Sequence, residues 1–359
     1  MSPRVHQHKA PFPYFGGKAS VSDEVWARFG DVGRYVEPFA GSLAVLLNRP
    51  EPFTGREIVN DADGLLVNVW RAMTADPAAV ARWADWPATE NDMHARHAWL
   101  VGQREDITRR LEGDPDWFDA KAAGWWLWGI SLWIGGGWCS GRGPWRVVDG
   151  QLLHASTDGQ GIHRQLLHAS TDGQGIHRQL LHAGDDGQGI HRKRLHAGDD
   201  GQEATTDGAS TGSADRLTRD FVALADRLRG VLIMCGDWKR VVTPAVLTGG
   251  GSKKATAIFL DPPYADTASR TSDLYAKDSE SVAHEVREWA IANGDNPLYR
   301  IALCGYDGEH SMPETWTEWA WKAAGGYEGQ RKDGKAGNSK RERIWFSPHC
   351  DRASLWDVA

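Results

Sequence analysis

The stretch FLDPPYAD at residues 259–266 places an acid, two prolines and a tyrosine directly after an apolar run. Proline fixes its own backbone and forces the preceding residue toward an extended conformation, yet its carbonyl stays available as an acceptor. Asp261 and the carbonyl of Pro262 are therefore predicted to form a rigid pair of acceptors beside the ring of Tyr264. Two acceptors and an aromatic face suit a planar amine, such as the exocyclic amino group of a base lifted out of a helix. A nitrogen held in this way could attack a methyl group. The alternative is that the prolines only end a strand.

Acidic residues also end other apolar segments that are predicted to be strands. The predicted strands are 34–37, 56–61, 230–237, 255–261 and 299–307. Near-continuous apolar runs of this length suit strands that are covered on both faces, as in a parallel sheet. The acids at the ends of four of them are Glu37, Asp61, Asp237 and Asp261. The carboxyl ends of the strands form the edge at which open α/β sheets bind ligands, although aspartates that only cap helices are the alternative.

Segments with a helical pattern separate these strands. They cover residues 42–49, 63–73, 214–229 and 279–294. Strands that alternate with helices predict an open α/β sheet. The first strand runs into EPFAGS, where Gly41 would let the backbone approach a ligand, and Asp61 follows twenty residues later. That separation is typical of a carboxylate that binds a ribose.

The alternation disappears between Trp86 and Asp215, where we predict an inserted module. Residues 117–145 carry seven of the nineteen tryptophans, and we expect Trp125, Trp126 and Trp128 to form the core of the module. A repeat of fourteen residues then fills 151–206, beginning QLLHASTDGQGIHR, and its DG turns favour hairpins or extended loops. The predicted organisation is a first catalytic part at 1–85, an inserted target-recognition module at 86–215 and a second catalytic part at 216–359.

The histidines and cysteines do not predict a metal site. Seven of the fourteen histidines lie in the repeats, but His163 and His168 are five residues apart and would lie on opposite faces of a strand. Solvated polar repeats are therefore favoured over metal binding. The cysteines are far apart, without the paired spacing of zinc ligands or of a disulfide framework, and we expect reduced thiols. They are Cys139, Cys235, Cys304 and Cys350.

The composition is that of a soluble globular protein, with 41% hydrophobic and 25% charged residues among 359. No secretory signal is visible in the first thirty residues, and the most apolar segment is too short and too rich in glycine to span a bilayer. We therefore expect a cytoplasmic protein without a membrane partner. The formal net charge of −7 means that any nucleic-acid partner must meet a local basic patch.

The motifs together resemble the Dam-type family of DNA adenine methyltransferases, which use S-adenosylmethionine. The segments that carry this resemblance, in the family's order, are PYFGGK at 13–18, EPFAGS at 37–42, IVNDAD at 58–63, CGDW at 235–238, DPPY at 261–264, ALCGYD at 302–307 and NSKRERIWFSP at 338–348. The resemblance implies a Rossmann-like class I methyltransferase fold, α/β with a mostly parallel sheet and an inserted DNA-recognition module. It also implies methyl transfer to the exocyclic amino group of an adenine flipped out of double-stranded DNA.

The resemblance further implies roles for individual residues. The residues implied to bind the cofactor are Tyr14, Gly17, Lys18, Glu37, Pro38, Phe39, Ala40, Gly41, Asp61, Asp237, Trp238 and Asp261. Among them, Lys18 would lie near the methionine carboxylate, Asp61 would hold the ribose hydroxyls, and Asp237 with Trp238 would meet the adenine. The residues implied to carry the target base are Asp261, Pro262, Pro263 and Tyr264. Tyr14 and Trp238 as core aromatics and Lys18 as a solvated charge are the alternatives.

Cations for phosphate contact cluster in two places despite the acidic total. The inserted module mixes basic and aromatic side chains at Trp138, Arg142, Trp145 and Arg146, a combination suited to gripping the backbone and stacking on bases. A basic run at 329–343, expected to form a loop before the last strand, includes Asn338, Lys340 and Arg341. The alternative for the tryptophan cluster is module core, and the alternative for the basic run is a solvated charged face.

The sequence departs from the family pattern after FAG, where Ser42 and Leu43 replace the second glycine that relatives often have. A homologue with weakened catalysis that still binds DNA therefore stays an alternative, as does a methyltransferase that acts on cytosine or RNA. We expect a monomer, or a dimer on DNA, in a bacterial or phage-infected cell. The repeats and a solitary methyltransferase suit phage or restriction-modification DNA.

Overall fold

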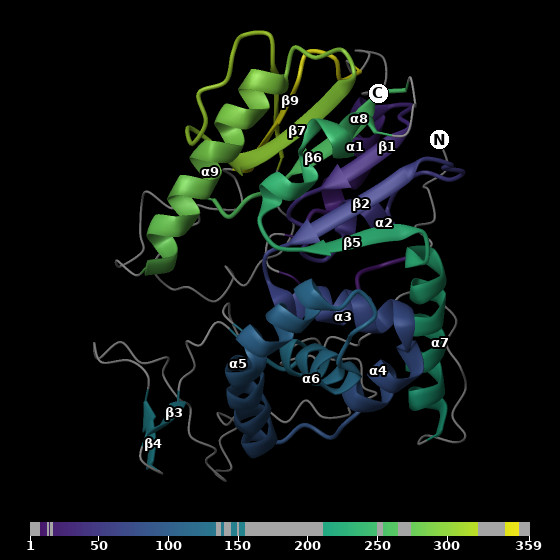
Figure 1. Cartoon of the computed structure of the whole chain (residues 1–359), viewed down its shortest axis with the longest axis vertical. Coiled ribbons are helices and arrows are strands. Elements are labelled where there is room, and N and C mark those ends of the chain that lie inside the picture. The colour runs from purple at the N-terminus through teal and green to yellow at the C-terminus, as the bar shows by residue number, and fades with distance from the viewer. Residues whose placement is uncertain are drawn as a thin grey trace, which may run out of the picture. The chain divides into compact units, whose positions relative to one another are not determined.

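The structure is a computed structural model of the chain. The residues that it describes are 8–12, 14, 17–133, 138–139, 145–148, 151–154, 211–249, 254–264, 274–321 and 342–351. At 90, 145–148, 151–154, 211–214 and 274–280 it describes the backbone alone. The chain forms two compact units (Figure 1). We call them the sheet unit, residues 1–9, 14–63 and 227–359, and the helical unit, residues 10–13 and 64–226.

The sheet unit is built on a seven-stranded sheet with the order β5-β2-β1-β6-β7-β9-β8. Its strands are β1 (Arg34–Glu37), β2 (Arg56–Asp61), β5 (Val231–Cys235), β6 (Thr256–Leu260), β7 (Tyr299–Tyr306), β8 (Thr317–Ala320) and β9 (Glu342–Phe346). The first five strands in the order are parallel, and β9 runs antiparallel to both of its neighbours. The predicted α/β fold with a mostly parallel sheet is confirmed, and its architecture is Rossmann-like.

All five strands predicted between 34 and 307 are present within a residue or two of their predicted ends. The last strand expected near the C-terminus is β9. The sequence analysis missed β8, because its side chains are mostly exposed and its four residues carry no apolar run. The predicted helices appear as α2 (Ala44–Leu47), α3 (Gly64–Ala75), α7 (Thr211–Leu228) and α9 (Leu274–Asn293), whereas α1 (Ser22–Phe29) and α8 (Pro244–Thr248) were not predicted.

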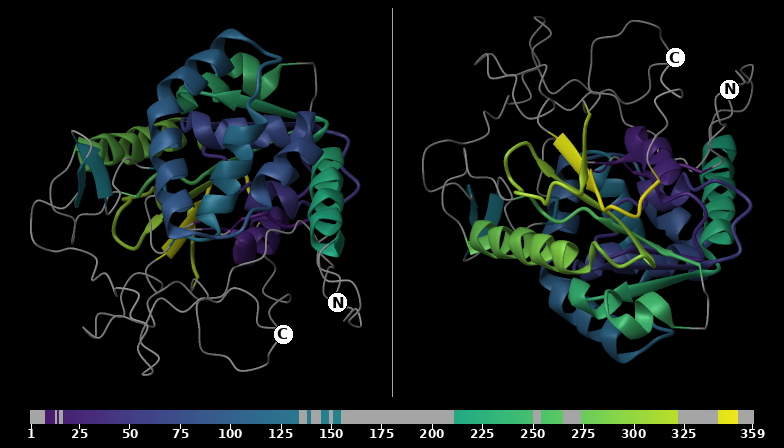
Figure 2. Two further views of the ribbon diagram at one scale, coloured as in Figure 1. Left: turned by 90° about the horizontal axis from the view of Figure 1, so that it is seen from below. Right: turned by 90° about the horizontal axis from the view of Figure 1, so that it is seen from above.

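Side chains of alternating parity cover the two faces of the sheet. On one face Val36, Ile58 and Ile258 pack with residues from α8, α9 and the short 3-10 helix η2 (Trp238–Val241). On the other face Tyr35 packs against Trp26 of α1, with ring centroids 4.9 Å apart. Figure 2 shows α1 and α9 on opposite sides of the strands. Both faces are therefore covered, as the apolar strands predict.

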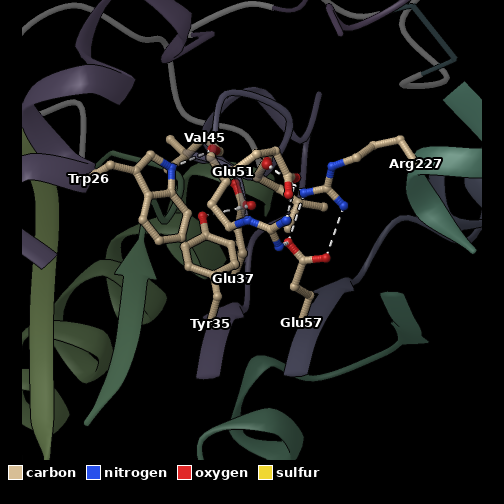
Figure 3. A network of polar contacts seen from close by, with 9 residues as sticks. Trp26, Tyr35, Glu37, Val45, Glu51, Glu57 and Arg227 are labelled. Carbon is tan, nitrogen blue, oxygen red and sulfur yellow. Dashed lines mark hydrogen bonds and ion pairs between the residues drawn. The ribbon is translucent and has the colours of Figure 1, made fainter. Parts of the chain in front are cut away.

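A buried network of charges holds the start of β2. Glu57 accepts hydrogen bonds from Arg227 over 2.9 and 2.8 Å and pairs with Arg49, which also contacts Glu51 at 2.6 Å. Arg227 additionally donates to the carbonyl of Leu46 over 2.9 Å. Figure 3 shows the facing side chains of Glu57 and Arg227. The network fixes the point at which the chain re-enters the sheet unit, at the edge opposite the strand ends that carry the acids.

The helical unit contains α3, α4 (Pro77–Ala84), α5 (Glu90–Gly113), α6 (Ala120–Ile130) and most of α7. Side chains cap three of these helices: Asp76 accepts from Ala79 N, Thr89 from Asp92 N and Asp119 from Ala122 N. Trp126 and Trp128 are buried, which confirms their predicted place in a core. Trp125 is partly buried. Apart from residues 10–13, the unit lies between β2 and β5 in the chain. The target-recognition module expected at 86–215 stays a prediction.

The start of the first repeat forms one strand of a short hairpin. Strand β3 (Trp145–Val148), which precedes the repeats, pairs with β4 (Gln151–His154) in antiparallel register, with Trp145 opposite His154. The hairpins or extended loops expected from the repeats themselves stay a prediction. The repeats beyond His154 lie outside the described residues. In the described part of the chain, none of the helices combines the length and apolarity needed to cross a bilayer.

Candidate active site

Four acids lie in a row along one edge of the sheet. In the order of the strands, Asp237 follows β5, Asp61 ends β2, Glu37 ends β1 and Asp261 follows β6. These strands are parallel, so their carboxyl ends share an edge about 14 Å across at the usual strand spacing. The strand order reverses between β1 and β6, because the chain moves from β1 to β2 on one side and reaches β6 on the other. Such a switch point is where open α/β sheets bind ligands.

The loop after β1 is fixed to the end of β2. The backbone amide of Gly41 donates to Oδ2 of Asp61 over 3.0 Å, and the amide of Asp63 donates to Oδ1 over 2.9 Å. Burial raises the pKa of Asp61 to about 6, and the same two amides hold it from rising further. Each carboxylate oxygen retains a lone pair for another donor. Asp61 is thus an oriented acceptor at the edge of the sheet.

Gly41 must be a glycine for two reasons. Its φ of 46° lies in the left-handed region, and a Cβ would lie 2.9 Å from Cε1 of Tyr14. The ring of Tyr14 therefore lies against the loop. Burial and then the charges of Asp61, Asp63 and Asp261 raise the pKa of Tyr14. The sheet edge therefore brings Tyr14 near acids from two different strands.

Leu43 lies in the stretch where the family that the sequence resembles often has a second glycine. Its φ of 56° and ψ of 26° are left-handed, and its side chain is fully buried. A left-handed conformation costs a residue with a Cβ about 1 to 2 kcal/mol, and glycine adopts it freely. The loop therefore keeps the shape that a glycine would favour, and the buried leucine side chain offsets the strain.

Three side chains bind Asp261, and one of them is the buried Cys304. Nζ of Lys18 lies 3.0 Å from Oδ2, and the hydroxyl of Tyr264 donates to Oδ1 over 3.0 Å. Lys18 also lies 3.7 Å from Oε2 of Glu342 on β9. Burial lowers the pKa of Lys18, but the carboxylates raise it more, so the net shift is upward and the side chain carries its charge. The ring of Tyr264 meets that of Tyr306 edge to face at 4.7 Å.

Glu37 lies close enough to Asp61 and Asp261 for their charges to raise its pKa. It is 3% exposed and accepts a hydrogen bond from Tyr35 over 2.9 Å (Figure 3). Burial raises the pKa of Glu37, the Tyr35 hydroxyl opposes the shift, and the charges of Asp261 and Asp61 add to it. Asp61 and Asp261 therefore converge on Glu37 as well as on Tyr14.

The remaining predicted cofactor residues take different positions. Asp237 is exposed and its Oδ1 accepts from the amide of Lys239 over 2.7 Å, so it caps η2. Trp238 is 5% exposed and packs on Phe39 with ring centroids 6.2 Å apart, as a core aromatic. Backbone hydrogen bonds join Gly17 to Tyr14 and Ala40 to Asn60, and the Asn60 side chain donates to the carbonyl of Pro38. Pro262 is buried and Pro263 is exposed.

Residues 14–94 match the family described as D12 class N6 adenine-specific DNA methyltransferase. The resemblance inferred from the motifs is confirmed for this stretch. No curated protein matches the chain in sequence. The D12 class match includes the Gly41 loop and Asp61 but ends before DPPY. The position of Asp261 beside that loop therefore comes from the fold.

Among the residues predicted to contact DNA, only Trp138 has a described side chain. Its Nε1 donates to the carbonyl of Trp126 over 3.1 Å, and its ring lies 5.3 Å from that of His97, so it packs within the helical unit. Trp145 and Arg146 lie on β3. The predicted contacts outside the described residues are Arg142, Asn338, Lys340 and Arg341.

Three residues at the edge were not predicted individually. Asn60 donates to the carbonyls of Pro38 and Gly236 and so links the ends of three neighbouring strands. Glu342 contacts Lys18, and Tyr306 contacts Tyr264. Asn60 lies within the motif IVNDAD but was given no role of its own. Glu342 lies in the basic run at 329–343, and that pattern indicates phosphate contact and not a buried acid.

Proposed function

We propose that the chain is an S-adenosylmethionine-dependent DNA methyltransferase that modifies the exocyclic amino group of an adenine flipped out of duplex DNA. The observation that carries this proposal is the position of Asp261. It lies at the switch point of the sheet and is followed by two prolines. The charges of Asp261 and Asp61 both raise the pKa values of Glu37 and Tyr14, so the two acids lie near the same residues. The D12 class match supports an N6-adenine-specific DNA methyltransferase in general.

The residues after β1 and β2 fit a nucleoside-like cofactor. Gly41 lets the backbone come close without a side chain, and Asp61 keeps lone pairs for the two ribose hydroxyls. Asp237 is exposed on the next strand, within reach of an adenine beyond the ribose. When bound, S-adenosylmethionine supplies a methyl group on a sulfonium, so that a nitrogen–carbon bond forms as the carbon–sulfur bond breaks and one amino proton is lost.

The residues after β6 fit the amino group of the base. Asp261 already binds Tyr264, Lys18 and Cys304, and a carboxylate offers about four acceptor sites, so capacity for a further donor remains. We assign that capacity and the carbonyl of Pro262 to the two amino hydrogens of the adenine. Binding both hydrogens directs the nitrogen lone pair away from the ring, and the rigid prolines keep the two acceptors in place.

The contacts of Lys18 support a role different from the one that the family resemblance implies. We propose that it orients the Asp261 carboxylate, because its Nζ lies between Asp261 and Glu342 and the side chain is 4% exposed. The helical unit is proposed to recognise the target sequence, with Trp138, Arg142, Trp145 and Arg146 among its contacts. The basic segment with Asn338, Lys340 and Arg341 is proposed to bind the phosphates.

The test is methyl transfer from labelled S-adenosylmethionine to equal amounts of duplex DNA and RNA, followed by digestion to nucleosides. The proposal predicts label in N6-methyladenosine from the DNA. Label in a methylated cytosine, or in RNA, would reassign the substrate. The absence of both label and calorimetric heat on adding the cofactor would instead identify a homologue that only binds DNA.

A further inference from the structure

We propose that Glu342 is a positioning residue for methyl transfer, because it holds Lys18 in place against Asp261. The inference rests on the proposed function and extends it to the antiparallel strand β9, which carries no part of the DPPY motif. Glu342 does not touch Asp261 or Tyr264 in the contacts described above, so it acts on the reaction through Lys18.

The side chain of Glu342 makes few other contacts in the part of the chain that is described. The residue is 8% exposed, and its Oε2 has no hydrogen-bond partner there. Its contact with Lys18 is an ion pair at 3.7 Å. Burial raises the pKa of Glu342, whereas the Lys18 ammonium lowers it. A buried carboxylate is costly unless a cation lies close, so Glu342 and Lys18 stabilise each other.

The surroundings leave Lys18 little freedom. Its Nζ lies 5.2 Å from the centre of the Tyr264 ring and 6.0 Å from that of Trp321. The side chain of Lys18 is 4% exposed, compared with 21% for Asp261. The ammonium thus lies on the buried side of Asp261, and a base can approach Asp261 from the exposed side. A lysine has a flexible four-carbon stem, and the second carboxylate limits the positions that it can take.

The pairing of β9 with β7 fixes the backbone position of Glu342. Glu342 is opposite Tyr306 in the register of β9 with β7, and the ring of Tyr306 packs on Tyr264. One strand pair therefore supports two of the side chains that hold Asp261: Tyr306 supports Tyr264, and Glu342 supports Lys18. A shift of β9 would disturb the ammonium, and misplacement of a reacting group by about 1 Å can lower a rate about a hundredfold.

The experiment compares four proteins: the wild type, Glu342→Gln, Lys18→Met and the double variant. Single-turnover methyl transfer is measured with DNA and S-adenosylmethionine at saturation. We expect Glu342→Gln to slow transfer about tenfold and leave cofactor affinity within about twofold. In the Lys18→Met background the same change should have no further effect, because the residue through which Glu342 acts is missing. Glu318→Gln, on the neighbouring strand β8, is the matched control, since Glu318 pairs with Arg343 and is half exposed.

The pH dependence gives a readout that a merely structural residue would not change. The groups that face Lys18 are Asp261, Tyr264, Cys304 and Glu342. Because the Glu342 carboxylate favours the protonated form of Lys18, its removal lowers the pKa of the lysine. The ratio of wild-type to Glu342→Gln rate should then grow only as the pH rises above about 10, the ordinary pKa of lysine, because Asp261 still raises the pKa of Lys18 in the variant. This measurement compares only the wild type with Glu342→Gln, so it does not depend on whether the two proteins that carry Lys18→Met fold.

The outcomes separate this inference from the proposed function. A wild-type protein that transfers no methyl group would refute the proposed function itself. A wild type that is active together with a Glu342→Gln variant that is equally fast would overturn the role of Glu342. An equal slowing by Glu342→Gln with and without Lys18, or a rate ratio that is constant with pH, would also overturn it.

Discussion

The backbone amide of Gly41 donates a hydrogen bond to Oδ2 of Asp61 over 3.0 Å. The two residues are twenty apart in sequence and belong to the ends of neighbouring strands, β1 and β2. The hydrogen bond gives the separation a physical meaning, because it holds the glycine loop against the carboxylate that is proposed to bind the ribose. Either residue can therefore be changed to test the loop.

Gly41→Ala should weaken binding of S-adenosylmethionine at least tenfold. The new Cβ would require a left-handed alanine and would lie 2.9 Å from the Tyr14 ring, so the loop or the ring must move. We also expect the free energy of unfolding to fall by about 1 kcal/mol or more. Calorimetry and chemical unfolding provide the measurements. Gly102→Ala is the control, because it lies inside α5 with open space around it and should be neutral or stabilising.

The affinity for S-adenosylmethionine should increase as the pH rises through about 6, the pKa to which burial raises Asp61. The ionised carboxylate accepts hydrogen bonds from hydroxyl groups better than the protonated acid does. The same raised pKa means that Asp61 is easier to ionise in the unfolded chain, so its contribution to stability falls as the pH rises from about 4 to about 6. Calorimetric titration at several pH values tests the first effect. Asp61→Asn should bind weakly with little dependence on pH in this range, and an unchanged slope in that variant would assign the titration to another group.

At position 43 the glycine variant should be more stable than the alanine variant, which is the reverse of the usual order. Leu43→Ala loses the buried side chain and keeps the left-handed strain, at a cost of about 2 to 5 kcal/mol. Leu43→Gly loses the same side chain and relieves the strain, so it should be more stable than the alanine variant by about 1 kcal/mol. Chemical unfolding measures both. Leu46, which is buried in the helical part of α2, is the comparison, and there alanine should be the more stable substitution. The same order at both positions would contradict the strain assigned to Leu43.

Glu57→Gln should lower the free energy of unfolding by about 3 kcal/mol, because it leaves the guanidinium groups of Arg49 and Arg227 buried against a neutral amide. Methyl transfer below the unfolding temperature should be unaffected, since the network lies at the other end of the strands. Glu24→Gln removes an ion pair with Arg28 at a partly exposed position in α1 and should cost less than about 1 kcal/mol. Equal effects of the two substitutions on thermal unfolding would argue against a buried network.

The order of the motifs was enough to predict the sheet and the acids along its edge. The strands had apolar runs bounded by acids, and parallel strands place their carboxyl ends together, so Asp61 and Asp261 could be assigned to one site. Strand β8 carried no such signal, because exposed side chains leave a short strand without an apolar pattern. The direction of β9 also could not be predicted, since an apolar run is the same for either orientation.

The contacts of single side chains were harder to predict than the site. Lys18 was expected near the carboxylate of the cofactor, and the ion pair with Asp261 at 3.0 Å depends on residues that are more than two hundred apart in sequence. Trp238 follows an acid in a motif that suggested ring contact with an adenine, and its packing against Phe39 could not be predicted from that motif. Residue type and spacing predict which strand end carries an acid, whereas burial and tertiary packing decide what each side chain contacts.

The central claim is that Asp261 directs a methyl group to the amino nitrogen of adenine. The most direct test is nucleoside mass spectrometry of DNA from cells without adenine methylation that express either the wild-type chain or Asp261→Ala. The account predicts N6-methyladenine with the wild type and none with the variant, while both purified proteins still bind S-adenosylmethionine. Absence of the modified base with the folded wild type, or equal amounts with both proteins, would contradict it.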